Sequence, residues 1–314
     1  MTFKHHLFVA FIVLAAAVWE FAPLLDAGFV FQDSAWQFVR GLPGEGHGFS
    51  RSLMRESWQW QERHTPSPLA FHAANLALHI CVSFLVAFLA YQLGASAFGT
   101  WIAGSVFLLN PIQAESVAYL SGRTELFAAI GVLCACLLLL PSLTWWRIVL
   151  AAVAMGFAML GKESAIILVA LVPIVRQRWA LATTAMASII ALLCVSGYGS
   201  FSAGWVLIQA AAAWRLLMTA VTLTGHVVDY DYLAVSAFAR WASVILLSVG
   251  LLYGWARRDV APRIAIGACW VAAVIGLRLF IRARFGEMPN VFNEHQFYLA
   301  MVGCSLIVSD LRWS

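Results

Sequence analysis

Six short clusters of polar and ionisable side chains stand out in a mostly apolar chain. The first is Phe31-Gln32-Asp33-Ser34, which follows an apolar run near the N-terminus. A carboxylate just beyond the end of a helix can act as a general base and take the proton from an acceptor hydroxyl. A solvated loop acid is the more common explanation of such a position, so position alone does not make Asp33 catalytic.

The second cluster consists of His72, Asn75 and His79, whose spacing of three and four residues places them on one face of a helix. Imidazoles at this spacing could bind a metal ion, but a metal site would need further donors nearby. Polar side chains inside an apolar helix also form hydrogen bonds to neighbouring helices. The pattern favours this structural role, and no metal site is predicted.

The third cluster extends from Asn110-Pro111 to Glu115 and continues at Arg123 and Glu125. Pro111 ends one apolar segment, and Arg123 and Glu125 begin the next. A glutamate in the first turn complements the helix dipole, which is the structural explanation for Glu125. Arg123 and the free N–H groups of the same helix could instead hold a phosphate group.

The fourth cluster is Gly161-Lys162-Glu163-Ser164, at a tight turn between two apolar segments. The Lys162–Glu163 pair can cap a helix, or it can place an ammonium group against a lipid phosphate. A nucleotide-binding P-loop is excluded, because the upstream glycine and the preceding strand are both missing.

Composition places these clusters in a membrane protein. Of the 314 residues, 62% are hydrophobic and 11% are charged. Soluble domains carry about 25% charged residues, so lipid must surround much of this chain. The net charge of +4 is spread along the sequence without a basic cluster, which excludes a nucleic-acid-binding function. The six cysteines lie inside apolar runs, and neither a disulfide framework nor a cofactor is predicted.

The apolar runs predict an all-α, polytopic transmembrane bundle with about ten spans in a single membrane domain. The stretch 201–225 is also apolar, but Gln209, Trp214 and Arg215 interrupt it, so it could be an interfacial or re-entrant helix. If it crosses the membrane, the later topology inverts. The predicted spans are 5–25, 68–92, 97–110, 124–141, 145–160, 164–176, 179–198, 237–256, 261–281 and 296–310.

Lysines and arginines near the span ends identify the cytoplasmic side. Residues 26–67 then form a long first periplasmic loop, and 199–236 form a second outer segment. Of the fifteen acidic residues, only Asp259 and Asp310 face the cytoplasm on this assignment. The segregation of the acids predicts that the chemistry occurs at the outer face.

The last two clusters lie in the second half of the chain, on the predicted outer side. Arginines are normally depleted there, and a negatively charged substrate would explain them. Alternatively, they extend along apolar surface or pair with the outer acids. The clusters comprise Asp229 and Asp231, and Glu294 and His295 preceded by Arg278, Arg282 and Arg284.

Taken in order, these motifs resemble the membrane half of the TMTC-type proteins, which are transmembrane, tetratricopeptide-repeat-containing O-mannosyltransferases with many bacterial relatives. The similarity extends from about Phe29 to Leu311, and the repeat domain of the family is expected to be absent. The motifs are His72-Ala-Ala-Asn75-Leu-Ala-Leu-His79, Asn110-Pro-Ile-Gln-Ala-Glu115, Ser121-Gly-Arg123-Thr-Glu125-Leu, Gly161-Lys162-Glu163-Ser164, Asp229-Tyr-Asp231-Tyr and Glu294-His295-Gln-Phe-Tyr-Leu.

The resemblance implies a GT-C glycosyltransferase fold in a bacterial inner membrane, with the active site facing the periplasm. Such enzymes take a sugar from a polyprenyl-phosphate carrier, and an acid of the first loop activates the acceptor. In this sequence that acid is Asp33. Two positions depart from the family pattern. Gln32 stands where the family often has a second acid, and Gln296 stands where the late motif usually has an arginine.

The chemistry can be stated without the family. A glycosyl phosphodiester already has a good leaving group, so the protein must position an acceptor, remove its proton and stabilise the departing phosphate. A single displacement inverts the anomeric centre.

Asp33 is the predicted base for an acceptor hydroxyl on a protein or a glycan. Arg51, Arg123 and Lys162 are predicted to bind phosphate or to organise the site. Four glutamates are predicted to orient these cations or to contact sugar hydroxyls: Glu115, Glu125, Glu163 and Glu294. The other predicted substrate-binding residues are His72, Asn75, His79, Asp229, Asp231, Arg282, Arg284 and His295.

Two other functions compete with this one. A non-catalytic homologue would bind lipid-linked sugar or act as a partner subunit, and Gln32 and Gln296 favour that alternative. A lipid-sugar transporter or flippase would show paired inverted halves with helices broken at the membrane midplane. No such internal repeat is visible, and the ionisable residues gather near one face instead.

Overall fold

The computed structural model describes residues 3–28, 51–178, 203–225, 235–280 and 294–310, with short pieces within 180–189 and 284–289. The chain divides into two compact units, Met1–Ala165 and Ile166–Ser314, which are described separately below. The single membrane domain expected from the sequence stays a prediction.

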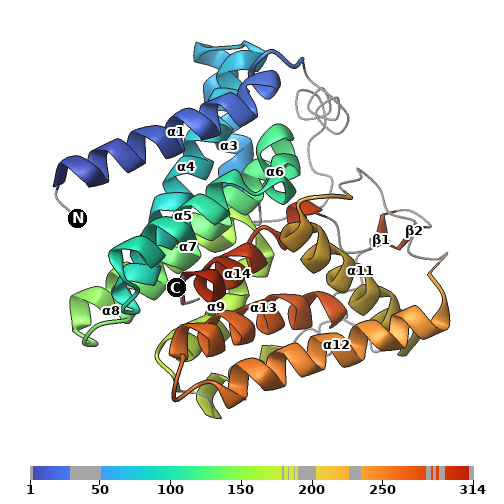
Figure 1. The fold of residues 1–314 in the computed structure, drawn as a ribbon. Helices are drawn as coiled ribbons and strands as arrows, with labels where there is room; N and C mark the ends of the chain where they lie inside the picture. The colour runs from blue at the N-terminus through green and yellow to red at the C-terminus, as the bar shows by residue number, and fades with distance from the viewer. Residues whose placement is uncertain are drawn as a thin grey trace. The chain divides into compact units, whose positions relative to one another are not determined.

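The secondary structure of the described residues of the first unit is helical (Figure 1). The amide N–H of Ala70 donates to the side chain of Ser67, and Pro68 occupies the first helical position, so α4 begins at this point. α5 ends at Leu109, because the backbone of the next residue, Asn110, is extended ahead of Pro111. The helices are α1 (Phe3–Leu25), α3 (Ser52–His64), α4 (Pro68–Gln92), α5 (Ala97–Leu109), α6 (Ala114–Ala118), α7 (Arg123–Leu139) and α8 (Trp145–Gly161), with the 3-10 turns η2 (Pro111–Gln113) and η3 (Leu120–Gly122). A third 3-10 turn, η4 (Glu163–Ile167), spans the boundary between the two units.

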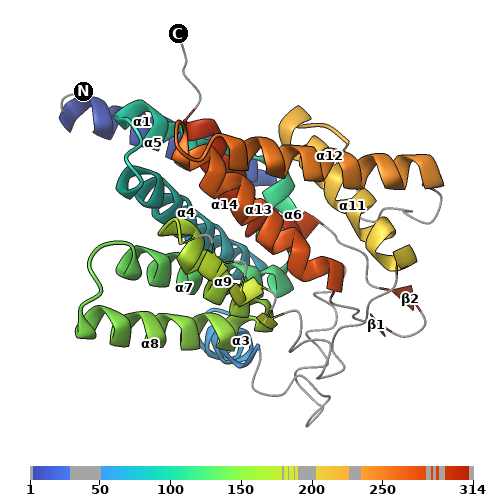
Figure 2. The same cartoon turned by 90° about the horizontal axis from the view of Figure 1, so that it is seen from below.

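Helices α7 and α8 pack directly against each other (Figure 2). A Cβ atom at Gly131 of α7 would lie 2.6 Å from both the carbonyl oxygen of Ala154 and the Cβ of Ala158 on α8. Only a glycine permits the two backbones to come this close. Gly156, on α8, has no atom within 4 Å of its hypothetical Cβ.

These two glycines form a matched pair for a stability test. Gly131→Ala is expected to lower the free energy of unfolding by about 1–3 kcal/mol, because the added methyl group overpacks the α7–α8 interface. Gly156→Ala should be neutral or raise that free energy by up to about 1 kcal/mol through helix propensity. Thermal unfolding of both variants in one detergent measures the difference. Equal effects at the two positions would contradict the close approach of α7 and α8.

In its described residues the second unit is also helical, apart from one two-stranded antiparallel ladder. A Cβ atom at Gly267 would lie 2.4 Å from the carbonyl oxygen of Gly303, so α13 and α14 meet at their backbones. The indole N–H of Trp270 donates to the carbonyl oxygen of Leu299 at 2.9 Å. The elements are α9 (Leu168–Val175), α11 (Ala203–Thr222), α12 (Ala237–Ala256), α13 (Pro262–Phe280), β1 (Arg284–Phe285), β2 (Met288–Pro289), η5 (Glu294–Phe297) and α14 (Ala300–Ser309).

Four helical stretches of the described chain are long and apolar enough to cross a membrane: Pro68–Gln92, Leu120–Leu139, Gly204–Thr222 and Ala237–Ala256. Large apolar side chains remain exposed along the last of them, Phe238 at 84% and Leu252 at 65%. Such a surface needs lipid or another apolar partner. The helical membrane bundle expected from composition is thereby confirmed, while the number of spans stays a prediction. Within the stretch 201–225, residues Ala203–Thr222 form α11, and Gly204–Thr222 is one of the four candidate crossings.

Candidate functional site

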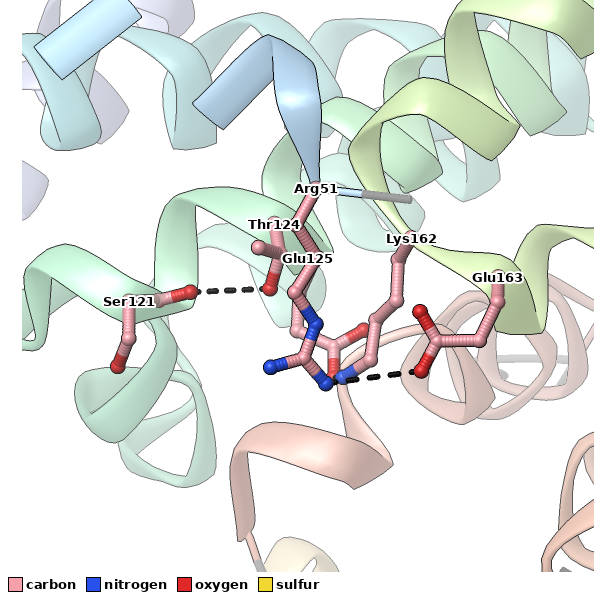
Figure 3. A network of polar contacts seen from close by, with 6 residues as sticks. All are labelled: Arg51, Ser121, Thr124, Glu125, Lys162 and Glu163. Carbon is pink, nitrogen blue, oxygen red and sulfur yellow. Dashed lines mark hydrogen bonds and ion pairs between the residues drawn. The ribbon is translucent and has the colours of Figure 1, made fainter. Parts of the chain in front are cut away.

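Four charged residues that the sequence singled out converge in the first unit, where the ends of three helices meet (Figure 3). Arg51 directly precedes α3, and Glu125 lies in the first turn of α7. Lys162 and Glu163 follow the last residue of α8. These residues, Arg51, Glu125, Lys162 and Glu163, are called the charged cluster below.

The ammonium group of Lys162 forms an ion pair with the carboxylate of Glu125, and the two side chains are only 7% and 5% exposed. Burial of both charges costs solvation energy that their attraction must offset. Gly161 permits this approach, because a Cβ there would lie 2.9 Å from the Cβ of Phe127 on α7. Glu125 therefore does more than complement a helix dipole: it neutralises a buried lysine 37 residues away.

The second ion pair of the cluster is more open. The Nη2 atom of Arg51 lies 3.5 Å from the Oε1 atom of Glu163, and the side chains are 31% and 56% exposed. Pairs this accessible contribute at most about 1 kcal/mol, so an incoming anion can replace the carboxylate. Arg51 also has a left-handed backbone (φ 66°), which costs a non-glycine residue about 1 kcal/mol or more.

Figure 3 shows the side chains of Arg51 and Lys162 directed toward the same region beside Glu125 and Glu163. A guanidinium and an ammonium group that converge in this way suit a phosphate, because both form charge-assisted hydrogen bonds to its oxygens. The open Arg51–Glu163 pair is the exchangeable part of the cluster, and the buried Lys162–Glu125 pair is the fixed part.

Arg123 is buried, with 2% of its surface exposed, and its hydrogen bonds go to neutral acceptors. Its Nε donates to the Oδ1 of Asn75 at 2.8 Å, and its Nη1 donates to the hydroxyl of Ser57 at 3.2 Å. Its Nη2 donates to the Oε1 of Gln61 at 2.9 Å and to the carbonyl oxygen of Phe71 at 3.2 Å. Of its two predicted roles, this geometry supports the organisation of the site rather than phosphate binding.

Two of the three polar side chains on one face of α4 form hydrogen bonds to neighbouring segments. The side-chain amide of Asn75 also donates to the carbonyl oxygens of Val117 and Tyr119, both at 3.1 Å. The Nε2 atom of His79 lies 3.0 Å from the carbonyl oxygen of Leu108. The ring nitrogens of buried His72 have no hydrogen-bond partner among the described residues. Within that same part of the chain, no group of three or more His, Cys, Asp or Glu residues could hold a metal ion.

Three of the other predicted site residues, Glu115, Glu294 and His295, lie on described elements, the first in the first unit and the other two in the second. Glu115 is half-buried on α6. Glu294 and His295 form part of η5 in the second unit, where Glu294 is buried. Asp33, Asp229, Asp231 and Arg282 lie outside the described residues, as does the side chain of Arg284.

Helix α3 lies within the segment 26–67 that the sequence analysis treated as a loop. Two of its residues, Ser57 and Gln61, contact Arg123, and the sequence analysis did not identify either one. The signal that could have revealed them is their spacing of four residues, which places both on one helical face with Trp58 beside them.

Two curated proteins of Drosophila melanogaster match parts of the chain. Protein O-mannosyl-transferase Tmtc1 is 32% identical over 108 residues, which are 32% of this chain and 12% of that protein. Protein O-mannosyl-transferase Tmtc2 is 32% identical over 144 residues, which are 38% of this chain and 15% of that protein. The chain thus spans a small part of these relatives' length. No family model matches the chain, and no solved structure matches it.

Proposed function

We propose that this protein is a membrane glycosyltransferase that moves a sugar from a polyprenyl-phosphate carrier to an acceptor hydroxyl at the outer face of the membrane. The observation that carries the proposal is the convergence of Arg51 and Lys162 beside two glutamates in a helical membrane protein. The similarity to two proteins named O-mannosyltransferases adds the reaction class. A GT-C arrangement of the spans is part of the proposal.

In the proposed reaction, the acceptor oxygen attacks the anomeric carbon of the lipid-linked sugar. The bond between that carbon and the phosphate oxygen breaks, and its electron pair leaves with the polyprenyl phosphate. The carboxylate of Asp33 takes the acceptor proton. Arg51 exchanges Glu163 for the phosphate, whose growing charge it stabilises together with Lys162. A single displacement of this kind inverts the anomeric centre.

The direct test supplies the purified protein, in lipid nanodiscs, with radiolabelled mannose on a polyprenyl phosphate and a peptide rich in serine and threonine. Mannose and a protein acceptor come first because the relatives are named for them. Glucosyl and arabinosyl carriers follow, with a glycan as second acceptor. We expect labelled acceptor and free polyprenyl phosphate in equal amounts. Transfer from a nucleotide-linked sugar instead would overturn the assignment of the donor.

The second candidate is a non-catalytic homologue that binds lipid-linked sugar. It is favoured by Gln32 and Gln296, which stand where the resembling family has charged residues. The same assay separates the two, because such a protein would retain the lipid-linked sugar on the nanodisc without releasing polyprenyl phosphate. Movement of the intact lipid between leaflets, without transfer, would instead identify a flippase.

A further inference from the structure

Helix α3 connects the buried side chain of Arg123 to the charged cluster. Arg51, the residue just before α3, forms an ion pair with Glu163. Ser57 and Gln61, within the helix, accept hydrogen bonds from Arg123. The side-chain amide of Gln61 donates in turn to the carbonyl oxygen of Ala70 at 2.7 Å. The contacts therefore tie α3 to α4 and α7.

We propose that Arg123 is a positioning residue: by holding α3 through Ser57 and Gln61, it places the guanidinium of Arg51 beside Lys162. The consequence for sugar transfer rests on the proposed function. The docking of α3 itself does not, because it follows from contacts within the first unit.

The guanidinium suits this task because its N–H groups lie in one plane and point in fixed directions. In Arg123 these directions are taken up by α3 and α4 together, through Ser57 and Gln61 on one side and Asn75 and Phe71 on the other. A lysine ammonium would preserve the charge but could not span both helices with directed hydrogen bonds. The shape of the side chain, rather than its charge, is therefore what the position requires.

The distance to Arg51 is short enough for the constraint to be transmitted. Ser57 lies six residues after Arg51, or about 9 Å along a helix at 1.5 Å per residue. Trp58 of α3 packs against Phe71 and Leu120, so the helix is held by apolar contacts as well as by hydrogen bonds. The apolar contacts stabilise the packing of α3, whereas the directed hydrogen bonds of Arg123 determine where α3 lies on this apolar surface. A displacement of about 1 Å in a substrate-positioning group can cost a hundredfold in rate.

Hydrogen–deuterium exchange on the full chain in nanodiscs tests the docking of α3 directly. Arg123→Lys and Gln61→Leu are expected to speed exchange at the α3 amides by about tenfold or more, because each breaks hydrogen bonds that hold the helix. Exchange along α5 should not change. Arg55→Ala is the control, since Arg55 is exposed on the same helix. Unchanged exchange in Gln61→Leu, which retains the buried charge, would overturn the proposal even if Arg123→Lys fails to fold.

Kinetics then test whether docking acts through Arg51. Gln61→Leu should raise the KM for the lipid-linked sugar by about tenfold and change kcat less, because Arg51 is displaced from the position in which it binds the phosphate. The double variant Gln61→Leu/Arg51→Ala should be no worse than Arg51→Ala alone, since both substitutions remove the same interaction. Additive effects would overturn the positioning role.

The two proposals fail in distinguishable ways. Faster exchange in Gln61→Leu with an unchanged KM overturns the positioning role and leaves the proposed function intact. If the wild-type protein transfers no sugar, the proposed function fails, and the dissociation constant for polyprenyl phosphate replaces KM in the same double-variant comparison. If Gln61→Leu changes that dissociation constant in the wild-type background but not in the Arg51→Ala background, Arg123 is still supported as the positioning residue. If the change persists in the Arg51→Ala background, the positioning role is overturned.

Discussion

Asp33→Asn is expected to lower the rate of sugar transfer by a factor of about 10² to 10⁴, the usual contribution of general-base catalysis. The amide has nearly the same size as the carboxylate but cannot take the proton from the acceptor hydroxyl. The loss should appear in kcat at saturating donor. The rate of label transfer from polyprenyl-phosphate mannose, measured in nanodiscs, provides the comparison.

A matched control for this prediction is available one residue away. Gln32→Asn shortens a neighbouring polar side chain without removing a carboxylate, and it should transfer sugar at close to the wild-type rate. Thermal unfolding of both variants should match the wild type, which shows that any loss is chemical. If Asp33→Asn retains its activity, another group accepts the proton and the assignment of Asp33 is wrong.

Lys162→Met is expected to have the largest effect on stability, a loss of about 3–5 kcal/mol in the free energy of unfolding. The methionine fills the space of the lysine, but it leaves the carboxylate of Glu125 buried without its cation. Glu163→Gln is the matched control at the exposed pair, where the loss should stay below about 1 kcal/mol. Denaturant unfolding of the three proteins in one detergent measures the difference.

The double variant Glu125→Leu/Lys162→Met separates the structural role of the buried pair from its role in the site. Replacing both charges with apolar groups should restore most of the stability, because no unpaired charge remains buried. If Lys162 also stabilises the departing phosphate, the restored protein should still transfer sugar poorly. A Lys162→Met variant as stable as Glu163→Gln would show that the pair is not buried as described.

Local sequence patterns were sufficient to predict where most helices lie. The predicted spans 68–92 and 237–256 coincide with α4 and α12, and Pro111 separates two helical segments as expected. These features depend on runs of apolar residues and on capping and proline geometry, all of which act over a few residues. Helix α3 was missed because its polar and charged residues read as loop, although one face of it is buried against neighbouring helices.

The sequence by itself determined that this is a helical membrane protein and which ionisable residues are unusual in it. The tertiary structure alone decided their partners in the first unit. Lys162 pairs with Glu125, 37 residues away, as well as standing next to Glu163, and Arg123 reaches Ser57 across 66 residues. Helix periodicity shows which face a side chain occupies but not which helix packs against that face. That choice depends on the fit of whole surfaces, such as the close approach at Gly131, and no short-range pattern contains it.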